Sequence, residues 1–266
     1  MRLFYLVVGL LLFLIGVELF YSHIPLTYER TAQVMGTTVK VKVSGPGAPH
    51  WTMRAIYEIK RLDRLFSKYD KGSEVSLINK LAGKAPLQVS ADTLSVLKLA
   101  QEVNRASHGA FDVYVKQELD LGGIGKGYAV ESARRLLLKK GVKSAIIDIH
   151  SSIAVIGNGW QVGVQDPQGR KKLLGVVVLN DGESLSTSAQ YEQPGHIIDP
   201  RTGKPAGKCL SVTVAAKDAA LADALSTAVF VLGPADGIKL LGRYGAKALI
   251  VDRNGKIYDN LGVKLR

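Results

Sequence analysis

Apolar and polar residues follow regular spacings along most of the chain, and these spacings predict both strands and helices. Residues 38–43 alternate valine with lysine, which is typical of a strand with one buried face. In residues 51–66 the apolar positions recur every three or four residues, as expected for an amphipathic helix. Ser73 and Ser90 stand before two further helical patterns, where serine is a favoured N-cap. The first part of the chain is therefore expected to be a strand followed by three helices.

The rest of the chain is richer in β-branched residues and is expected to be mostly strands. Asn158-Gly159 and Asp181-Gly182 are sequences typical of hairpin turns. We predict helices at residues 128–140 and 234–244, a further helix around Asp223, and strands at 145–149, 153–156, 160–165, 174–179, 184–187, 211–215, 246–252 and 256–258. The predicted fold class is α+β, a mixed fold with two interlocked subdomains around a central cleft.

An uninterrupted apolar run, residues 3–17, follows Arg2 at the N-terminus. Its length lies between that of a signal-peptide core and that of a short membrane span, and no small-residue cleavage site follows it. We favour an uncleaved anchor over a cleaved signal, and Arg2 agrees with a cytoplasmic N-terminus. Residues 1–22 are therefore expected to be a membrane anchor or signal segment. The main domain, residues 30–262, is expected on the periplasmic face of the inner membrane.

The chain of 266 residues is strongly basic, with 35 Lys and Arg against 23 Asp and Glu and a net charge of +12. Such a surface could meet nucleic acid, anionic lipid or a small anion. The basic residues are scattered and no nucleic-acid motif is present, so we expect no nucleic-acid partner. Cys209 is the only cysteine, which excludes an intrachain disulfide, and we expect it to be a small buried residue.

Residues 120–128 read Asp-Leu-Gly-Gly-Ile-Gly-Lys-Gly-Tyr and stand just before a predicted helix. Backbone N–H groups at a helix start, together with Lys126, would form an anion site. The alternative is a tight loop that lets a helix and a sheet approach closely. The segment fits neither the dinucleotide fingerprint, which needs glycine at Tyr128, nor the P-loop, which needs Ser or Thr at Gly127.

Residues 195–233 combine a turn-rich loop, a strand and a helix. The loop, residues 196–203, contains Pro200 and Gly203 and holds His196, Asp199 and Arg201. In the helix, Asp223 and Thr227 are one turn apart and so lie on one face. Two oxygen side chains at this spacing suit a hard cation such as Mg²⁺. The alternative is a hydrogen bond between Asp223 and Thr227 on a solvated helix face.

Taken together, these segments resemble the ApbE-type flavin transferases, the FAD:protein FMN transferase family. The resemblance covers about residues 30–260, and several motifs occur in register along the chain. They are His-Ile-Ile-Asp-Pro-Arg-Thr-Gly at 196–203, Ala-Asp-Ala-Leu-Ser-Thr-Ala at 222–228, Met-Gly-Thr-Thr at 35–38, Ser-Lys-Tyr at 67–69, Ser-Glu-Val-Ser-Leu-Ile-Asn at 73–79, Gly-Ala-Phe-Asp at 109–112, and the glycine-rich segment at 120–128. Two segments depart from the family pattern: His150-Ser151-Ser152 replaces Gly-Gly-Asp or Gly-Gly-Asn, and Ser188-Ala189-Gln190-Tyr191 replaces Ser-Gly-Asp-Tyr.

The resemblance implies a Mg²⁺-dependent enzyme that transfers the FMN part of FAD to a threonine hydroxyl and releases AMP. The implied acceptor is a protein subunit of a membrane redox complex with a Ser/Asp-Gly-x-Thr site. His196 is the natural general base, since histidine as a residue type titrates near neutral pH; the alternative is that it only braces its loop. The resemblance implies a metal site at Asp223, Thr227 and the carbonyl of Gly123, and contacts to the flavin nucleotide from Met35, Tyr69, Asn79, Ala110, Phe111, Asp112, Asp120, Lys126 and Ile198.

Simpler interpretations of several of these residues stay open. Met35, Ala110, Phe111 and Ile198 have the composition of ordinary core residues, while Asn79 could be a helix cap and Tyr69 an interfacial side chain. Two other functions also stay open on the same scaffold. One is an FAD pyrophosphatase, in which water replaces the acceptor hydroxyl, and the other is a flavin-binding protein without catalysis.

Overall fold

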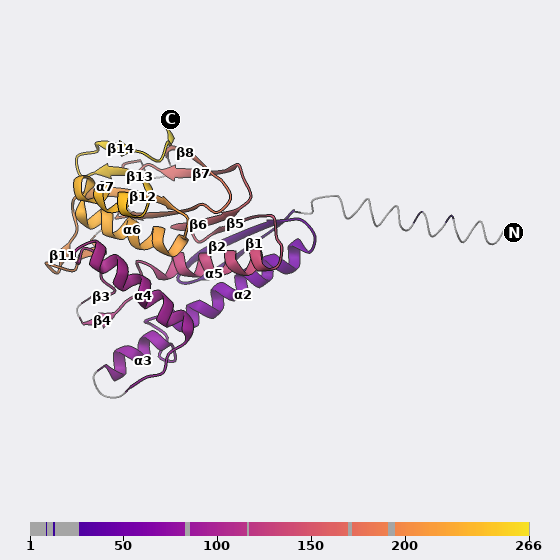
Figure 1. Ribbon diagram of the computed structural model, residues 1–266, viewed down its shortest axis with the longest axis horizontal. Helices are drawn as coiled ribbons and strands as arrows, with labels where there is room; N and C mark the ends of the chain where they lie inside the picture. The colour runs from indigo at the N-terminus through magenta and orange to yellow at the C-terminus, as the bar shows by residue number, and fades with distance from the viewer. Residues whose placement is uncertain are drawn as a thin grey trace.

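A continuous sheet of eight strands runs through the middle of the molecule in the computed structural model (Figure 1). The strand order is β1-β2-β5-β6-β9-β12-β13-β14, and every neighbouring pair is antiparallel. The strands are β1 (Thr27–Val34), β2 (Thr37–Ser44), β5 (Ser144–Asp148), β6 (Ser152–Ile156), β9 (Ser184–Ala189), β12 (Cys209–Ala216), β13 (Lys247–Asp252) and β14 (Ile257–Asp259). The structure describes Gly9, Phe13 and residues 27–82, 86–115, 117–169, 172–190 and 195–265.

Helices pack on one face of this sheet and form the larger hydrophobic core with it. On that face the sheet contributes alternate residues, such as Val39 and Val41 of β2, because successive side chains of a strand point to opposite faces. The helices are α2 (Ala48–Phe66), α3 (Glu74–Leu81), α4 (Ala91–Ala106), α5 (Gly125–Lys139), α6 (Ala219–Leu232) and α7 (Pro234–Arg243). Within the described ranges, none of the helices combines the length and the apolar character needed to cross a membrane.

The opposite face of the eight-stranded sheet carries a three-stranded sheet of order β15-β8-β7 and a second hydrophobic core. Its strands are β7 (Trp160–Gln165), β8 (Leu173–Leu179) and β15 (Lys264–Leu265). Strand β6 lies between the two cores, with Ile153 and Val155 in one and Ala154 and Ile156 in the other. All five residues of β6 are therefore buried. Two short hairpins complete the fold: β3 (Tyr114–Val115) with β4 (Glu118–Leu119), and β10 (Ile198–Asp199) with β11 (Lys204–Pro205).

The α+β class predicted from the sequence is confirmed, as are its helices and most of its strands. The side chains of Ser73 and Ser90 cap α3 and α4 by accepting the N–H groups of Ser76 and Thr93. Cys209 is buried as expected, and burial raises the pKa of its thiol to about 12. The features that were missed include strand β1, the two short hairpins, strand β15, and the start of α5, which begins at Gly125 rather than at Tyr128.

The two predicted hairpin turns are real turns but do not form hairpins. The chain passes at Asn158 from β6 in the large sheet to β7 in the small one, and at Asp181 it returns from β8 to β9. The turns bind each other, since the N–H of Asp181 donates to Oδ1 of Asn158 at 3.0 Å and the N–H of Gly157 donates to Oδ1 of Asp181 at 2.9 Å. The local glycine signal predicted the turns, whereas strand pairing was decided by packing between the sheets.

The predicted membrane anchor or signal segment, residues 1–22, lies outside the described residues except for Gly9 and Phe13. The boundaries of the main domain, residues 30–262, stay a prediction.

Candidate functional site

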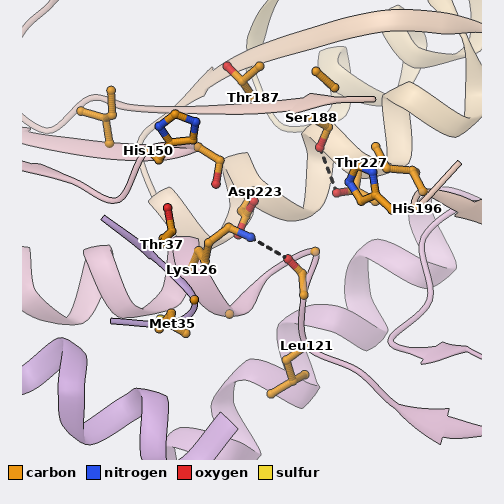
Figure 2. Close-up of a pocket in the computed structure, with 18 of the residues that line it drawn as sticks. Met35, Thr37, Leu121, Lys126, His150, Thr187, Ser188, His196, Asp223 and Thr227 are labelled. Carbon is orange, nitrogen blue, oxygen red and sulfur yellow. Dashed lines mark hydrogen bonds between the residues drawn. The ribbon is translucent and has the colours of Figure 1, made fainter. Parts of the chain in front are cut away.

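A pocket of about 1200 Å³ opens beside the first turn of α5 and the middle of α6 (Figure 2). It exceeds the usual range of about 300–1,000 Å³ for small-ligand pockets. The sequence-predicted residues that line it are Met35, Tyr69, Ala110, Phe111, Asp112, Asp120, Gly123, Lys126, His196, Ile198, Asp223 and Thr227. The fold thus brings together twelve of the thirteen predicted site residues, from segments far apart in the sequence.

Asp223 is the buried acid of the site, with 4% of its surface exposed. Its Oδ2 accepts the backbone N–H of Gly127 at 2.9 Å, and its Oδ1 accepts the hydroxyl of Ser186 at 3.0 Å. Burial raises the pKa of the Asp223 carboxyl, while the nearby charge of Lys126 acts in the opposite direction. The alternative of a hydrogen bond to Thr227 on a solvated helix face is wrong, because Asp223 is buried and binds α5 and β9 instead.

The contact between α5 and α6 is very close at Gly127. A Cβ atom at this position would lie 2.2 Å from the carbonyl oxygen of Ala219, so only glycine fits here. One turn further along α5, Glu131 is also buried and accepts the N–H of Ala219, the first residue of α6, at 3.2 Å. The two helices are thereby held together at the point where Asp223 faces the start of α5.

Lys126 lies next to this contact and extends into the pocket near Asp223 (Figure 2). Its Nζ donates to the carbonyl of Gly122 at 3.3 Å, within the glycine-rich loop. Both interpretations of that loop are therefore supported, because the glycines allow close helix packing and the lysine faces the pocket. The N–H groups of Gly125 and Gly127 are already bound, to the carbonyl of Leu121 at 2.7 Å and to Asp223. A ligand anion would thus be bound by the Lys126 ammonium rather than by these two backbone N–H groups.

Thr227 and its neighbours supply neutral oxygen atoms beside Asp223. The hydroxyl of Thr227 hydrogen-bonds that of Ser188 at 3.1 Å, and Ser188 in turn hydrogen-bonds Ser226 at 2.8 Å. The backbone of Gly123 is close by, since a Cβ atom there would lie 3.2 Å from Oγ1 of Thr227. One carboxylate with hydroxyl and carbonyl oxygens is the donor type that hard cations prefer.

No group of three or more His, Cys, Asp or Glu residues suited to a metal occurs among the residues that the structure describes. A cation beside Asp223 would therefore depend on hydroxyl, carbonyl and ligand oxygens for most of its coordination. Mg²⁺ is commonly bound in this way, through one or two carboxylates together with substrate phosphates. The donor set thus fits magnesium bound with a phosphate ligand.

One side of the pocket mouth is formed by Asp120 and Tyr69. Asp120 pairs with Lys68 at 2.6 Å and accepts the N–H of Gly122 at 2.8 Å, so it shapes the glycine-rich loop. Tyr69 is 85% exposed, and the Lys68 ammonium lies 5.3 Å from the centre of its ring. An exposed ring at a pocket mouth is available for stacking on a planar ligand.

The apolar wall of the pocket includes Met35, Ala110 and Phe111. Met35 has a positive φ of 55°, and its N–H donates to Asp63 at 3.1 Å. Ala110 and Phe111 are buried in the larger core and also line the pocket, so core packing and ligand contact are compatible for these residues. Asp112, at the end of this segment, accepts the N–H of Tyr114 at 2.8 Å.

His196 lies on the loop that leads into the β10–β11 hairpin, and it is exposed. Asp199 stiffens this hairpin by accepting two bonds from the Arg201 guanidinium, at 2.9 and 2.8 Å. This pairing lowers the pKa of the Asp199 carboxyl. Ile198 lines the pocket from the same hairpin, while Figure 2 shows His196 and His150 on opposite sides of Lys126.

Asn79 is the one predicted flavin contact that the structure does not support. In the described structure it does not line the pocket, because both ends of its amide are used elsewhere. Its Nδ2 donates to the carbonyl of Leu119 at 3.0 Å, and its Oδ1 accepts the N–H of Leu119 at 2.7 Å. Asn79 therefore holds the residue that precedes Asp120, which is a structural role.

Several pocket residues were missed by the sequence reading. Asp63 lines the pocket and positions Met35, and the hydroxyl of Ser188 bonds to Thr227. Asp148 accepts the N–H of His150 at 2.7 Å, and burial raises the pKa of the Asp148 carboxyl. His150 has a positive φ of 67°, which is uncommon outside glycine. The sequence signals were the two departures from the family pattern, which contain His150 and Ser188. Asp63 and Asp148 had no such signal.

Comparison with known proteins gives consistent matches. The model of the ApbE family matches residues 35–118 and 115–250. A FAD:protein FMN transferase of Klebsiella pneumoniae (strain 342) is 27% identical over 298 aligned positions, which cover 90% of this chain and 93% of that protein. One of Rhodobacter capsulatus is 31% identical over 187 positions; they cover 65% of this chain, but this chain spans only 34% of that protein.

Solved structures agree with the sequence matches. The ApbE protein of Thermotoga maritima has a TM-score of 0.80 at 28% identity, covering 88% of this chain and 97% of that one. The flavin transferase ApbE of Vibrio cholerae has the same TM-score and coverage at 23% identity, which supports the fold. The resemblance inferred from the motifs is confirmed, and the chain belongs to the ApbE family.

Proposed function

We propose that this protein is a FAD:protein FMN transferase, as its relatives from Klebsiella and Rhodobacter are named. The observation that carries the proposal is the meeting of Lys126, Asp223 and Thr227 in one large pocket, with His196 on its wall. A cationic side chain beside buried oxygen ligands suits a diphosphate, and an imidazole suits a hydroxyl nucleophile.

Lys126 is proposed to bind the pyrophosphate of FAD. Two of the N–H groups around it are already bonded, so its ammonium supplies most of the positive charge that the protein offers here. Tyr69, Met35, Ala110–Asp112, Asp120 and Ile198 would hold the rest of the nucleotide, through stacking at the exposed ring and through apolar contact at the wall. Asp120 would act by shaping the loop that carries Lys126.

A magnesium ion would be held by Asp223, Thr227 and the carbonyl of Gly123. The raised pKa of the Asp223 carboxyl reflects the cost of burying a charge, and a neighbouring cation would offset that cost. When bound, the cation would neutralise charge on the diphosphate as the reaction proceeds. The helix contact at Gly127 would keep Asp223 turned toward the pocket both with and without the cation.

His196 is proposed to take the proton from the attacking hydroxyl. A new bond forms between that oxygen and the phosphorus of the FMN part, and the bond from this phosphorus to the bridging oxygen of the diphosphate breaks. AMP leaves with that oxygen as part of its phosphate. The exposed position of His196 supports this role, because the acceptor must come from outside the protein. We propose a threonine as the acceptor residue, in a protein subunit of a membrane redox complex.

The location is also part of the proposal. The apolar run at residues 3–17 would hold the enzyme at the periplasmic face of the inner membrane. Cell fractionation tests this: the full-length protein should be found with the inner membrane, and recovery in the cytoplasm would contradict the proposal.

One alternative has support from the structure. Since His196 is exposed, water could reach the position of the acceptor hydroxyl, which would give an FAD pyrophosphatase. The deciding experiment incubates the protein with FAD, Mg²⁺ and a polypeptide that carries an Asp-Gly-x-Thr segment. Transfer predicts flavin fluorescence that stays on the polypeptide after denaturation, together with AMP. Hydrolysis predicts free FMN and AMP, and a binding protein without catalysis leaves FAD intact.

A further inference from the structure

Strand β9 turns a row of buried serines toward α6. Ser184, Ser186 and Ser188 lie on one face of the strand, while Leu185 between them points into the core on the other face of the sheet. The surface that a sheet presents to a helix is usually apolar, because a buried hydroxyl needs a hydrogen-bond partner. Ser188 has two such partners on α6, whereas the Oγ atom of Ser184 is buried without one in the described part of the chain.

The spacing of two of these serines matches the spacing of the proposed metal ligands on α6. Residues two apart in a strand are separated by about 6.6 Å, and residues four apart in a helix by about 6 Å along the axis. Ser186 accordingly bonds to Oδ1 of Asp223 at 3.0 Å, and Ser188 bonds to Oγ1 of Thr227 at 3.1 Å. Each of these two side chains of α6 therefore meets its own serine on β9.

The hydroxyl groups of Thr227, Ser188 and Ser226 form a chain of hydrogen bonds, of which Figure 2 shows the bond between Ser188 and Thr227. At the far end of the chain, the Oγ atom of Ser226 donates to the carbonyl of Asp223 at 2.8 Å. A carbonyl only accepts, so Ser226 uses its one proton there, as serines in helices often do. Ser188 must then donate to Ser226, and Thr227 must donate to Ser188. The three bonds can form together in this direction only.

This direction decides what the Thr227 hydroxyl offers to the pocket. A threonine hydroxyl has one proton and two lone pairs, and here the proton is used on Ser188. The lone pairs of Oγ1 are left for another group, and Thr227 lines the pocket together with Asp223. A cation is bound by lone pairs and repelled by a hydroxyl proton, so the orientation of this hydroxyl bears directly on cation binding.

We infer that Ser188 is a positioning residue of the metal site, which directs the Thr227 hydroxyl by accepting its proton. The inference rests on the proposed function, in which a magnesium ion is bound beside Asp223 and Thr227. Ser188 acts on the cation through Thr227. Asp223 keeps separate bonds to α5 and β9, so removing the hydroxyl of Ser188 leaves the carboxylate in place.

A double-mutant cycle on the full-length protein tests this inference, with calorimetry in the presence of FAD to measure the affinity for Mg²⁺. Ser188→Ala should weaken Mg²⁺ binding about two- to tenfold, which corresponds to one neutral hydrogen bond. In a Thr227→Val background there is no hydroxyl to direct, so the same change should have less than about a twofold effect. Equal losses in the two backgrounds, no loss in either, or unchanged Mg²⁺ affinity in Thr227→Val alone would overturn the inference.

Ser184→Ala is the matched control, because it removes the same atom from the same face of β9 where the described structure gives that atom no partner. Its Mg²⁺ affinity should equal that of the wild type, and a loss as large as that of Ser188→Ala would overturn the inference. FAD affinity without Mg²⁺ should be the same in the wild type and in both serine variants. A loss in Ser188→Ala would mean that Ser188 contacts the nucleotide itself, which also overturns the inference. The expected Mg²⁺ affinities without any transfer would support the positioning role while contradicting the transferase function.

Discussion

The α5–α6 contact and the loop at residues 195–205 line the same pocket but are held in different ways. At the helix contact, Gly127 and Asp223 are buried and bind each other directly, and Glu131 ties the helices together one turn further on. The loop contains a small hairpin that is stiffened by bonds within it, such as those between Asp199 and Arg201. His196 stands exposed at its start.

The difference separates two tasks of the proposed reaction. Asp223, the proposed cation ligand, is held in place by core packing. Changes at the helix contact should therefore alter stability and ligand binding together. His196, the proposed general base, lies on the surface. Its loss should therefore change the rate of transfer while leaving the fold and FAD binding in place. Four substitutions can break or sharpen this comparison.

Asp223→Asn should have the largest effect and remove transfer activity. The amide can still accept the N–H of Gly127 and donate to Ser186, so the fold is kept, but the charge that would hold a cation is lost. Calorimetry with Mg²⁺ in the presence of FAD should show no cation binding to the variant. Full transfer by Asp223→Asn, or by the wild type in excess chelator, would rule out this metal site.

The same variant gives a pH prediction. Because burial raises the pKa of the Asp223 carboxyl, the folded state binds its proton more tightly than the unfolded state does. The cation-free wild type should therefore lose stability as pH rises through this raised pKa. Thermal melts of Asp223→Asn should not show this loss of stability with rising pH. An identical pH dependence in the two proteins would contradict the predicted cost of ionising Asp223.

His196→Ala should slow transfer by about 10²–10⁴-fold, the usual value of general base catalysis. FAD affinity and thermal stability should stay near those of the wild type, because the side chain is exposed. The acid limb of the wild-type pH–rate profile should disappear in the variant. If His196 only braces its loop, FAD affinity or stability falls along with the rate, and the acid limb remains.

Gly127→Ala should destabilise the protein by about 1–3 kcal/mol or more, because the added methyl group meets the carbonyl of Ala219. Chemical denaturation measures this, and Mg²⁺ and FAD binding should weaken with it as α6 moves away from α5. Gly242→Ala in α7 is the matched control. Nothing lies within 4 Å of a Cβ atom there, so the same change in a helix should be neutral or stabilise by up to about 1 kcal/mol.

Lys126→Ala should weaken FAD binding by about 1–3 kcal/mol, the value of a charge-assisted contact. Since neighbouring N–H groups are already bonded, the backbone can compensate little. Riboflavin, which has no phosphate, should bind wild type and variant alike, and Lys60→Ala on α2 serves as a control for net charge. An equal loss for riboflavin would mean that Lys126 supports the fold rather than the phosphates.

Much of the fold could be predicted because its signals are local. Ser73 and Ser90 cap helices three residues ahead of the N–H groups that they accept, and alternation in β2 reports one buried face directly. The motifs likewise identified twelve pocket residues, since each motif lies within a few consecutive positions. The bonds of Asn79 could not be predicted, because its partner, Leu119, is 40 residues away and no nearby pattern indicates them.

By itself, the sequence determined the helices, most strands, the family and the residue types of the site. The tertiary structure decided which of these meet. The bond between Gly127 and Asp223 joins residues 96 positions apart, and the turns at Asn158 and Asp181 change sheets instead of closing hairpins. Local spacing governs backbone conformation, whereas such long-range contacts depend on how whole elements bury their apolar faces against one another.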